Sequence, residues 1–172
     1  MEESKTEERK ITLVSGEGKG FRVTKDVALM SGTVSSMLEG HDYSKEIEVP
    51  LLNVSSEILE IVISFCVHHV KSPMSEIDKP LKSATMSENV DEWDAKFIDD
   101  QTQNVIFGLI LAANYMNIKS LLDLSCAKVS SLIKGKTPEE IRRTFNIKND
   151  FGTEEEKKMR EENEWCVESI SS

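Results

Sequence analysis

The first apolar and polar residues of the chain alternate as they do in short strands. Residues 11–23, ITLVSGEGKGFRV, carry Ile11 and Leu13 before a glycine-rich turn, and Phe21 and Val23 after it. Alternating apolar residues on both sides of a glycine turn are typical of two antiparallel strands. This segment therefore predicts a β-hairpin.

Short helices and a further strand are predicted next. Residues 24–40, TKDVALMSGTVSSMLEG, give two helical pieces broken near Gly32, and residues 46–52, EIEVPLL, predict a strand. The segment SSEILEIVISFCVHHV follows, with Ser55 or Ser56 as its cap, and it is apolar almost all round. A helix of that kind is expected to be buried on more than one side.

Residues 71–90 break the pattern, because they contain two prolines and four serines and show no helical or strand period. We expect a mobile loop. A tolerated insertion is the simplest interpretation, and Ser72 before Pro73 is the only hint of a modification site. From Asp91 onward the chain is predicted to be wholly helical, in five segments: 91–100, 102–117, 119–134, 137–147 and 153–169.

The tripeptide GKT, residues 135–137, is also the end of the phosphate-binding motif GxxxxGK[ST]. That motif needs a glycine five residues before Gly135, where this chain has Ser130. We instead expect Gly135 to end one helix and the following TPEE to begin the next with a capping box. A second capping box, Thr153 with Glu156, is predicted to open the last helix.

Composition narrows the classes of partner. The chain has 172 residues, which leaves room for one domain and an extension, and a formal net charge of −10. Binding to a nucleic-acid backbone relies on clustered lysine and arginine, so we expect no nucleic-acid partner. The longest apolar stretch, residues 105–113, is about half of the roughly 20 residues that span a bilayer, so we expect no membrane partner.

The expected location is the cytoplasm and the nucleus. Residues 1–10, MEESKTEERK, are charged and contain no apolar signal segment. The three cysteines, at positions 66, 126 and 166, form no CxxC pair, and an odd number makes a poor disulfide framework. A reducing compartment suits them.

The densest group of reactive side chains is Cys66, His68 and His69. Successive helical residues are about 100° apart, so the two histidines cannot both face a ligand position shared with Cys66. The only other histidine is His41. We interpret the group as a buried cysteine and two histidines near a helix C-terminus. Since no carboxylate pair stands out as acid and base, we expect no catalysis, metal or cofactor.

The C-terminal region carries apolar side chains in a polar context. Ile141 and Phe145 share one helix face, and Ile147 and Phe151 follow among charged and amide residues. The final helix holds few apolar residues but ends near Trp165. Ordering a residue costs about 1–2 kcal/mol, which burial has to offset. A helix with so few apolar residues buries too little surface to dock firmly by itself. The tryptophan either folds back onto the preceding helix or anchors a partner, and the frequency of tryptophan at interfaces favours the partner.

The C-terminal half of the sequence resembles a known family. LILAANYMNIKSLLDLSCAKVSSLIKGKTPEEIRRTFNIKNDF, residues 109–151, followed by EENEWC, strongly resembles the S-phase kinase-associated proteins that serve as adaptors in SCF ubiquitin ligases. The likeness runs from about Lys10 to Cys166, with weaker echoes in the opening hairpin, in VPLLNVSSEILEIVISFCVHH and in EWDAKFI. A match of that length and order is more specific than any short motif above.

The resemblance implies an α+β fold, a BTB/POZ domain of short strands and helices with two additional C-terminal helices. It implies a flexible N-terminus at 1–9 and a BTB/POZ domain at 10–134 that contains the mobile loop 71–90. F-box-binding helices at 135–168 and a flexible tail at 169–172 complete the expected organisation.

The resemblance also implies a bridging role without catalysis, in which a cullin N-terminal region holds the BTB part and the last helices grip the F-box of a substrate receptor. Asn114 and Tyr115 of AANY match the cullin-contacting pair of the family. The residues that match or lie within its F-box-binding helices are Leu122, Val129, Ile133, Ile141, Phe145, Ile147, Phe151 and Trp165.

The chain departs from the family at two points. Segment 71–90 is less acidic and less rich in proline than is common. Some relatives carry a proline after NDF that oxygen-sensing hydroxylation modifies, whereas Gly152 and Thr153 occupy this stretch, so we expect that regulation to be absent. Two alternatives stay open: an adaptor of another cullin complex, like elongin C, and a self-associating BTB scaffold. A weak homodimer of the free chain is also compatible with the resemblance.

Overall fold

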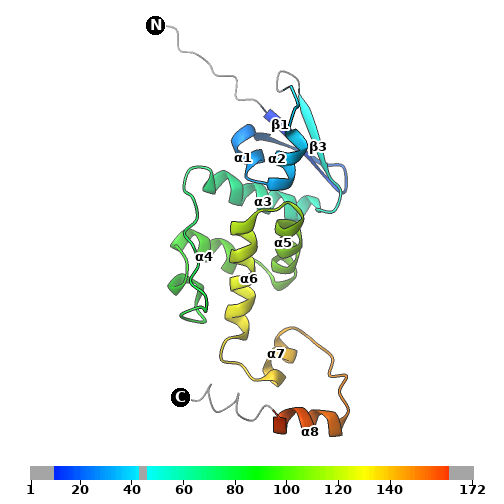
Figure 1. The fold of residues 1–172 in the computed structure, drawn as a ribbon, viewed down its shortest axis with the longest axis vertical. Coiled ribbons are helices and arrows are strands. Elements are labelled where there is room, and N and C mark those ends of the chain that lie inside the picture. Colours follow the sequence, from blue (N-terminus) through cyan, green and yellow to red (C-terminus); the bar gives the residue numbers. More distant parts are fainter. Residues whose placement is uncertain (1–9, 43–45, 163–172) are drawn as a thin grey trace.

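The computed structural model describes residues 10–42 and 46–162, and it begins with a three-stranded sheet (Figure 1). The strands are β1 (Lys10–Ser15), β2 (Gly20–Thr24) and β3 (Ile47–Leu51). β1 lies in the middle, antiparallel to β2 and parallel to β3. The predicted hairpin is therefore confirmed.

The register of β1 places the apolar residues of the sheet on one face. Ile11 lies opposite Val23 and Ile47, and Leu13 lies opposite Val49. Side chains alternate along a strand, so these residues share a face, and all but Ile47 are fully buried. Parallel strands need a crossover connection, which α1 (Lys25–Leu29) and α2 (Gly32–Leu38) supply between β1 and β3.

Four longer helices build the rest of the core. They are α3 (Ser56–His69), α4 (Glu92–Asp99), α5 (Gln103–Tyr115) and α6 (Lys119–Ile133). Ser55 caps α3, because its hydroxyl accepts from the Ile58 amide at 3.4 Å. The buried residues of α3 lie on one broad face, and Val67 is 49% exposed. α3 was expected to be buried on more than one side, but the face that carries Val67 is open to solvent.

A buried hydrogen-bonded pair joins α3 to α4. Nε2 of His69 lies 2.8 Å from Oδ1 of Asp94, and Nδ1 lies 2.7 Å from the carbonyl oxygen of Ser72. Both paired side chains are almost completely buried. The ring of Trp93 lies edge-on to His69 and stacks on His68, with ring centroids 3.7 Å apart in the stacked pair. The two histidines therefore have structural partners in two different directions.

The segment 71–90 is irregular, as its lack of a period predicted, apart from the short 3-10 turn η1 (Met86–Glu88). It is nevertheless packed, because Ile77 and Met86 are buried in the core. The side-chain oxygen of Asn89 accepts from the Lys82 amide at 2.8 Å and ties the loop to itself. The segment contacts both α4 and α6 and covers part of the core, so it is more than a surface insertion.

The last two helices stand apart from the core. α7 (Pro138–Thr144) and α8 (Thr153–Glu162) lie beyond the end of α6, far from the sheet, and contribute no buried residue (Figure 1). Gly135 has a φ of +74°, the left-handed conformation that glycine adopts cheaply after a helix. The capping box of Thr137 with Glu140 is present at the start of α7. GKT is thus a joint between helices, as predicted.

The predicted cap of α8 is wrong by one residue. α8 already includes Thr153, so the capping position belongs to Gly152. The carboxylate of Glu155 accepts from the Gly152 amide at 3.1 Å, and the Gly152 carbonyl accepts from the Glu156 amide. Three glutamates follow one another here. The capping-box pattern selected Glu156, whereas Glu155 makes the bond. Among the described residues, none of the helices has the length and apolar character needed to cross a membrane.

We expect Asp94→Ala to lower the free energy of unfolding by about 1–3 kcal/mol, because it leaves a buried ring nitrogen of His69 without its hydrogen-bond partner. Asp99→Ala is the matched control, since Asp99 is paired with Lys128 at 2.7 Å but is 45% exposed. This control should cost less than about 1 kcal/mol. Chemical denaturation measures both, and equal costs would contradict a structural role for the buried pair.

Candidate functional site

α6 passes from the core into solvent. Leu121 and Leu124, near its start, are completely buried, whereas Ile133 at its end is 38% exposed. Leu122 and Val129 are partly buried and share a face with Ile133, since positions separated by seven and four residues nearly coincide around a helix. We call Leu122, Val129 and Ile133 the α6 stripe. It is an apolar face that the fold covers only in part.

α5 presents a second exposed apolar pair, Phe107 and Leu111. Phe107 is 41% and Leu111 is 71% exposed, and the two are four residues apart on one face of the helix. The sequence reasoning missed them, because the segment from Val105 to Ala113 is apolar on every side. Burial in the structure separates this pair from the neighbouring core residues Ile106 and Leu109.

α7 docks against the start of α5. The ring centroids of Phe107 and Phe145 are 6.0 Å apart, and Nε2 of Gln103 donates to the Thr144 carbonyl at 3.1 Å. Ile141 and Phe145 are both partly buried. The structure therefore brings Phe145, at the end of α7, next to α5.

The connection between α7 and α8 exposes two more of the predicted residues. Ile147 is 54% and Phe151 is 42% exposed. The Arg142 guanidinium lies 5.8 Å from the ring centre of Phe151. Trp165, which the sequence placed in the same surface, lies outside the described residues.

Ion pairs on the surface hold α8 to α7. Arg160 lies 2.8 Å from Glu139, and Arg142 lies 3.3 Å from Glu156. A cleft of about 600 Å³ opens between the two helices, with Phe151 and the exposed Met159 in its lining. The Arg160–Glu139 pair is exposed, whereas the Arg142–Glu156 pair is partly buried. An exposed ion pair contributes at most about 1 kcal/mol, and α8 has no buried residue, so α8 is weakly fixed.

The predicted cullin-contacting pair lies at the other end of α5. Asn114 is exposed and Tyr115 is partly buried against the core. The Thr33 hydroxyl donates to the Tyr115 carbonyl at 2.8 Å, and the Ser31 hydroxyl donates to the Met116 carbonyl. These bonds fix the end of α5 on α2.

The backbone of α2 approaches the end of α5 closely at Gly32, where a larger residue would have to displace the Asn117 side chain. The Gly32 amide donates to the Asn117 carbonyl at 3.2 Å, and a Cβ at position 32 would lie 2.5 Å from the Asn117 side-chain nitrogen. Eleven helical residues, about 16 Å along the axis, separate Gln103 from Asn114. The Asn114 and Tyr115 patch is thus separate from the apolar surface around Phe107 and α7.

The group of Cys66, His68 and His69 has the character of core structure. Burial raises the pKa of the Cys66 thiol to about 12, so the thiol is protonated at neutral pH and is a poor nucleophile or ligand. The histidines are engaged by Asp94 and Trp93 as described above. No group of three or more histidine, cysteine or acidic side chains within the described residues is arranged to hold a metal ion.

Comparison with known proteins identifies the family. Residues 9–71 match the family model described as "Skp1 family, tetramerisation domain", and residues 119–166 match "Skp1 family, dimerisation domain". An S-phase kinase-associated protein 1 homolog from Tetrahymena thermophila is 49% identical over 162 residues, which cover 94% of this chain and 96% of the relative. The chain belongs to the Skp1 family. The fold expected from the sequence, an α+β structure with a BTB/POZ-like domain, is thereby confirmed.

Further members of the Skp1 family are also similar over nearly their whole length. SKP1-like protein 1A from Arabidopsis thaliana is 49% identical over 160 residues, 93% of this chain and 98% of the relative. The E3 ubiquitin ligase complex SCF subunit sconC from Arthroderma benhamiae is 45% identical over 163 residues, 95% of this chain and 98% of the relative. The Skp1-family matches include α1 to α3 in one part and α6 to α8 in the other.

The start of α7 should loosen in acid before the core does. The pKa of the Glu140 carboxyl is lowered, chiefly because it accepts from the Thr137 amide. A carboxylate with a lower pKa in the folded state stabilises the fold above its unfolded pKa, and this stabilisation disappears as the pH falls. The loss should therefore begin as the pH falls through the ordinary value of 4.5 and be complete below the lowered pKa.

Hydrogen exchange measures this loosening as a falling protection factor at the Glu140 amide, whose partner is the Thr137 hydroxyl at 3.3 Å. The amide of Leu59 in α3, bonded to the Ser55 carbonyl, serves as the internal control. Parallel loss of protection at both amides would contradict separate acid loosening of α7.

Proposed function

We propose that this chain is the adaptor subunit of an SCF-type E3 ubiquitin ligase. It bridges a cullin scaffold to F-box substrate receptors, so that the proteins bound by the receptors are ubiquitinated and degraded. The observation that carries this function is the 45% identity, over 95% of the chain, to a protein named as an SCF subunit. The adaptor positions other proteins and takes no covalent part in the transfer of ubiquitin.

The apolar surface at the C-terminal end supports an F-box site. The α6 stripe, Phe107 of α5 and the residues of α7 leave apolar side chains exposed or partly exposed, and Ile147 and Phe151 extend them toward α8. Covering such side chains with the apolar face of partner helices contributes about 25 cal/mol per Å² buried, which offsets the entropy lost on association. The proposed F-box-binding residues are Leu122, Val129, Ile133, Ile141, Phe145, Ile147, Phe151 and Trp165, to which we add Phe107, whose ring lies against Phe145.

The patch of Asn114 and Tyr115 is the proposed cullin site. Two side-chain hydrogen bonds from α2 fix the backbone beneath it, so little order is lost when a partner binds. An aromatic ring adds contact area with only two side-chain torsions to immobilise. We therefore expect the cullin site to be preformed and the F-box site, which includes the weakly held α8, to tighten on binding.

Self-association is a second proposed property. The family models that match this chain are described as dimerisation and tetramerisation domains. We propose a weak homodimer of the free chain that uses the α6 stripe and gives way to an F-box protein. The elongin C-like alternative is disfavoured, because the similarity extends through α7 and α8. The proposed location is the cytoplasm and the nucleus.

Tyr115→Lys should abolish binding to a cullin N-terminal domain and leave binding to an F-box protein unchanged. The added charge lies on the rigid patch, where it would be buried without a partner in the complex. Calorimetry with each partner measures both affinities, and the melting temperature of the variant shows that it is folded.

Trp165→Ala is the reciprocal variant. It should weaken F-box binding by about 2–4 kcal/mol if the ring is an anchor, and it should leave cullin binding unchanged. Loss of both partners in either folded variant would contradict the model of two separate sites.

A further inference from the structure

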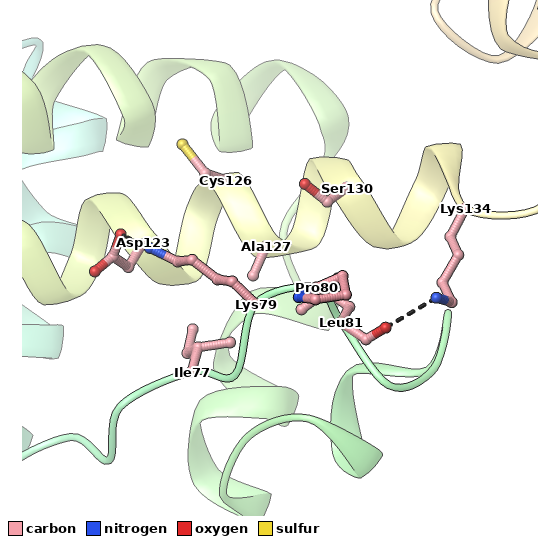
Figure 2. Close-up of a pocket in the computed structure, with 9 residues that line it drawn as sticks. All are labelled: Ile77, Lys79, Pro80, Leu81, Asp123, Cys126, Ala127, Ser130 and Lys134. Atoms are coloured by element: carbon pink, nitrogen blue, oxygen red, sulfur yellow. Dashed lines mark hydrogen bonds and ion pairs between the residues drawn. The ribbon is translucent and has the colours of Figure 1, made fainter.

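A groove of about 360 Å³ lies between the loop after α3 and one flank of α6 (Figure 2). Its floor is apolar and is formed by Ile77, Pro80 and Leu81 of the loop together with Ala127 of α6. Ile77 and Ala127 are nearly buried, so the floor is continuous with the hydrophobic core. An apolar side chain placed on it would extend that core.

Cations dominate the rim of the groove. The Lys79 ammonium lies 3.0 Å from the Asp123 carboxylate on the opposite wall. The Lys134 ammonium donates to the Leu81 carbonyl at 2.8 Å, the bond drawn in Figure 2. Two lysines thus stand against one carboxylate in the lining, although the chain as a whole has a net charge of −10.

The rim favours an acidic ligand. Asp123 already compensates Lys79, so the excess positive charge lies toward Lys134. An ammonium has three donors, and within the described residues the recorded acceptor of Lys134 is a neutral carbonyl. A carboxylate from a partner would form the stronger charge-assisted bond there.

The groove adjoins the α6 stripe. At about 100° per residue, the wall positions 123, 130 and 134 lie about 100° around the helix from Leu122, Val129 and Ile133. Cys126, at the edge of the groove, lies between these two faces. A helix is about 10 Å across, so an arc of about 100° is roughly 9 Å long, and an extended residue spans about 3.3 Å, so about three residues lead from the stripe to the groove.

We propose that the groove holds a short acidic and apolar segment of the F-box receptor, directly next to its F-box. An apolar side chain of the segment lies on the floor of Ile77, Pro80 and Leu81, and a carboxylate pairs with Lys134. This inference rests on the proposed function, because the receptor reaches the groove only when its F-box covers the α6 stripe. Receptors with such a flank bind more tightly than receptors without one, so the groove contributes to the choice among receptors.

A double-mutant cycle tests the pairing with complete proteins. The adaptor is used as the wild type and with Lys79→Glu and Lys134→Glu combined. The receptor is used with its native acidic flank and with the acidic residues of that flank changed to the corresponding amides. The charge-reversed adaptor should bind the native receptor about tenfold more weakly, because like charges then face each other. It should bind the amide receptor within about twofold of the wild type.

Two further variants serve as controls for the double-mutant cycle. Lys71→Glu makes the same change of charge at an exposed residue just after α3, beside Arg22 and Lys25 rather than beside the groove, and should alter neither affinity. Lys134→Glu alone keeps the test informative if the double variant is unstable, because Lys134 is exposed and is the proposed partner of the carboxylate. Addition of salt should reduce the advantage of the native flank, since the contact is partly screened.

Hydrogen exchange locates the contact. The native receptor should slow exchange in residues 77–81, and the amide receptor should slow it less. Equal loss of affinity for both receptors, or no loss for either, would overturn the groove proposal while leaving the adaptor function intact. Protection of 77–81 in the free chain that disappears when residues 163–172 are removed would assign the groove to the chain's own end and also overturn it. Failure of the wild-type chain to bind the receptor at all would instead contradict the proposed function, and this inference with it.

Discussion

The rest of the structure depends on one helix, α6, which begins inside the hydrophobic core and ends at the solvent-exposed surface. Its first half is part of the core through Leu121 and Leu124, and its second half carries Val129 and Ile133 out of it. α7 and α8 follow but bury no residue, so they cannot offset the entropy of ordering by their own packing. The fold therefore ends in a partly covered apolar surface, and the free energy available from covering it is released when a partner binds. This makes a stable domain at one end compatible with a binding surface at the other.

The two proposed partner sites differ in how firmly the chain holds them. Hydroxyls of Ser31 and Thr33 fix the end of α5 beneath Tyr115 through long-range bonds that are partly or fully buried. α8, in contrast, is attached to α7 by exposed ion pairs such as that of Arg160 with Glu139. A rigid site and an adaptable site on one chain suit an adaptor, because a constant scaffold needs one fixed geometry and varied receptors need some accommodation. The length of α5 separates the proposed cullin site from the proposed F-box site.

Local chemistry could be predicted from the sequence, and contacts between distant segments could not. Gly135 and TPEE determine the helix joint through backbone preferences that act over a few residues, and both were predicted correctly. The pairing of His69 with Asp94 joins residues 25 positions apart, and no periodicity reveals it. The exposure of Phe107 could not be predicted, because α5 is apolar on all sides. Only the packing of the neighbouring residues shows which face of α5 the core does not cover. The burial of Ile77 was hidden for the opposite reason, since a loop without a period gives no signal of what it covers.

Size-exclusion chromatography with light scattering tests the central claim most directly, when the chain is mixed with an F-box protein, with a cullin N-terminal domain, and with both. The account predicts two binary complexes and one ternary complex that contains a single copy of each protein, because the two sites lie at opposite ends of α5. Displacement of one partner by the other would show that the sites overlap and would contradict the bridge. Binding to neither partner would mean that the chain keeps the fold of the Skp1 family without its adaptor function.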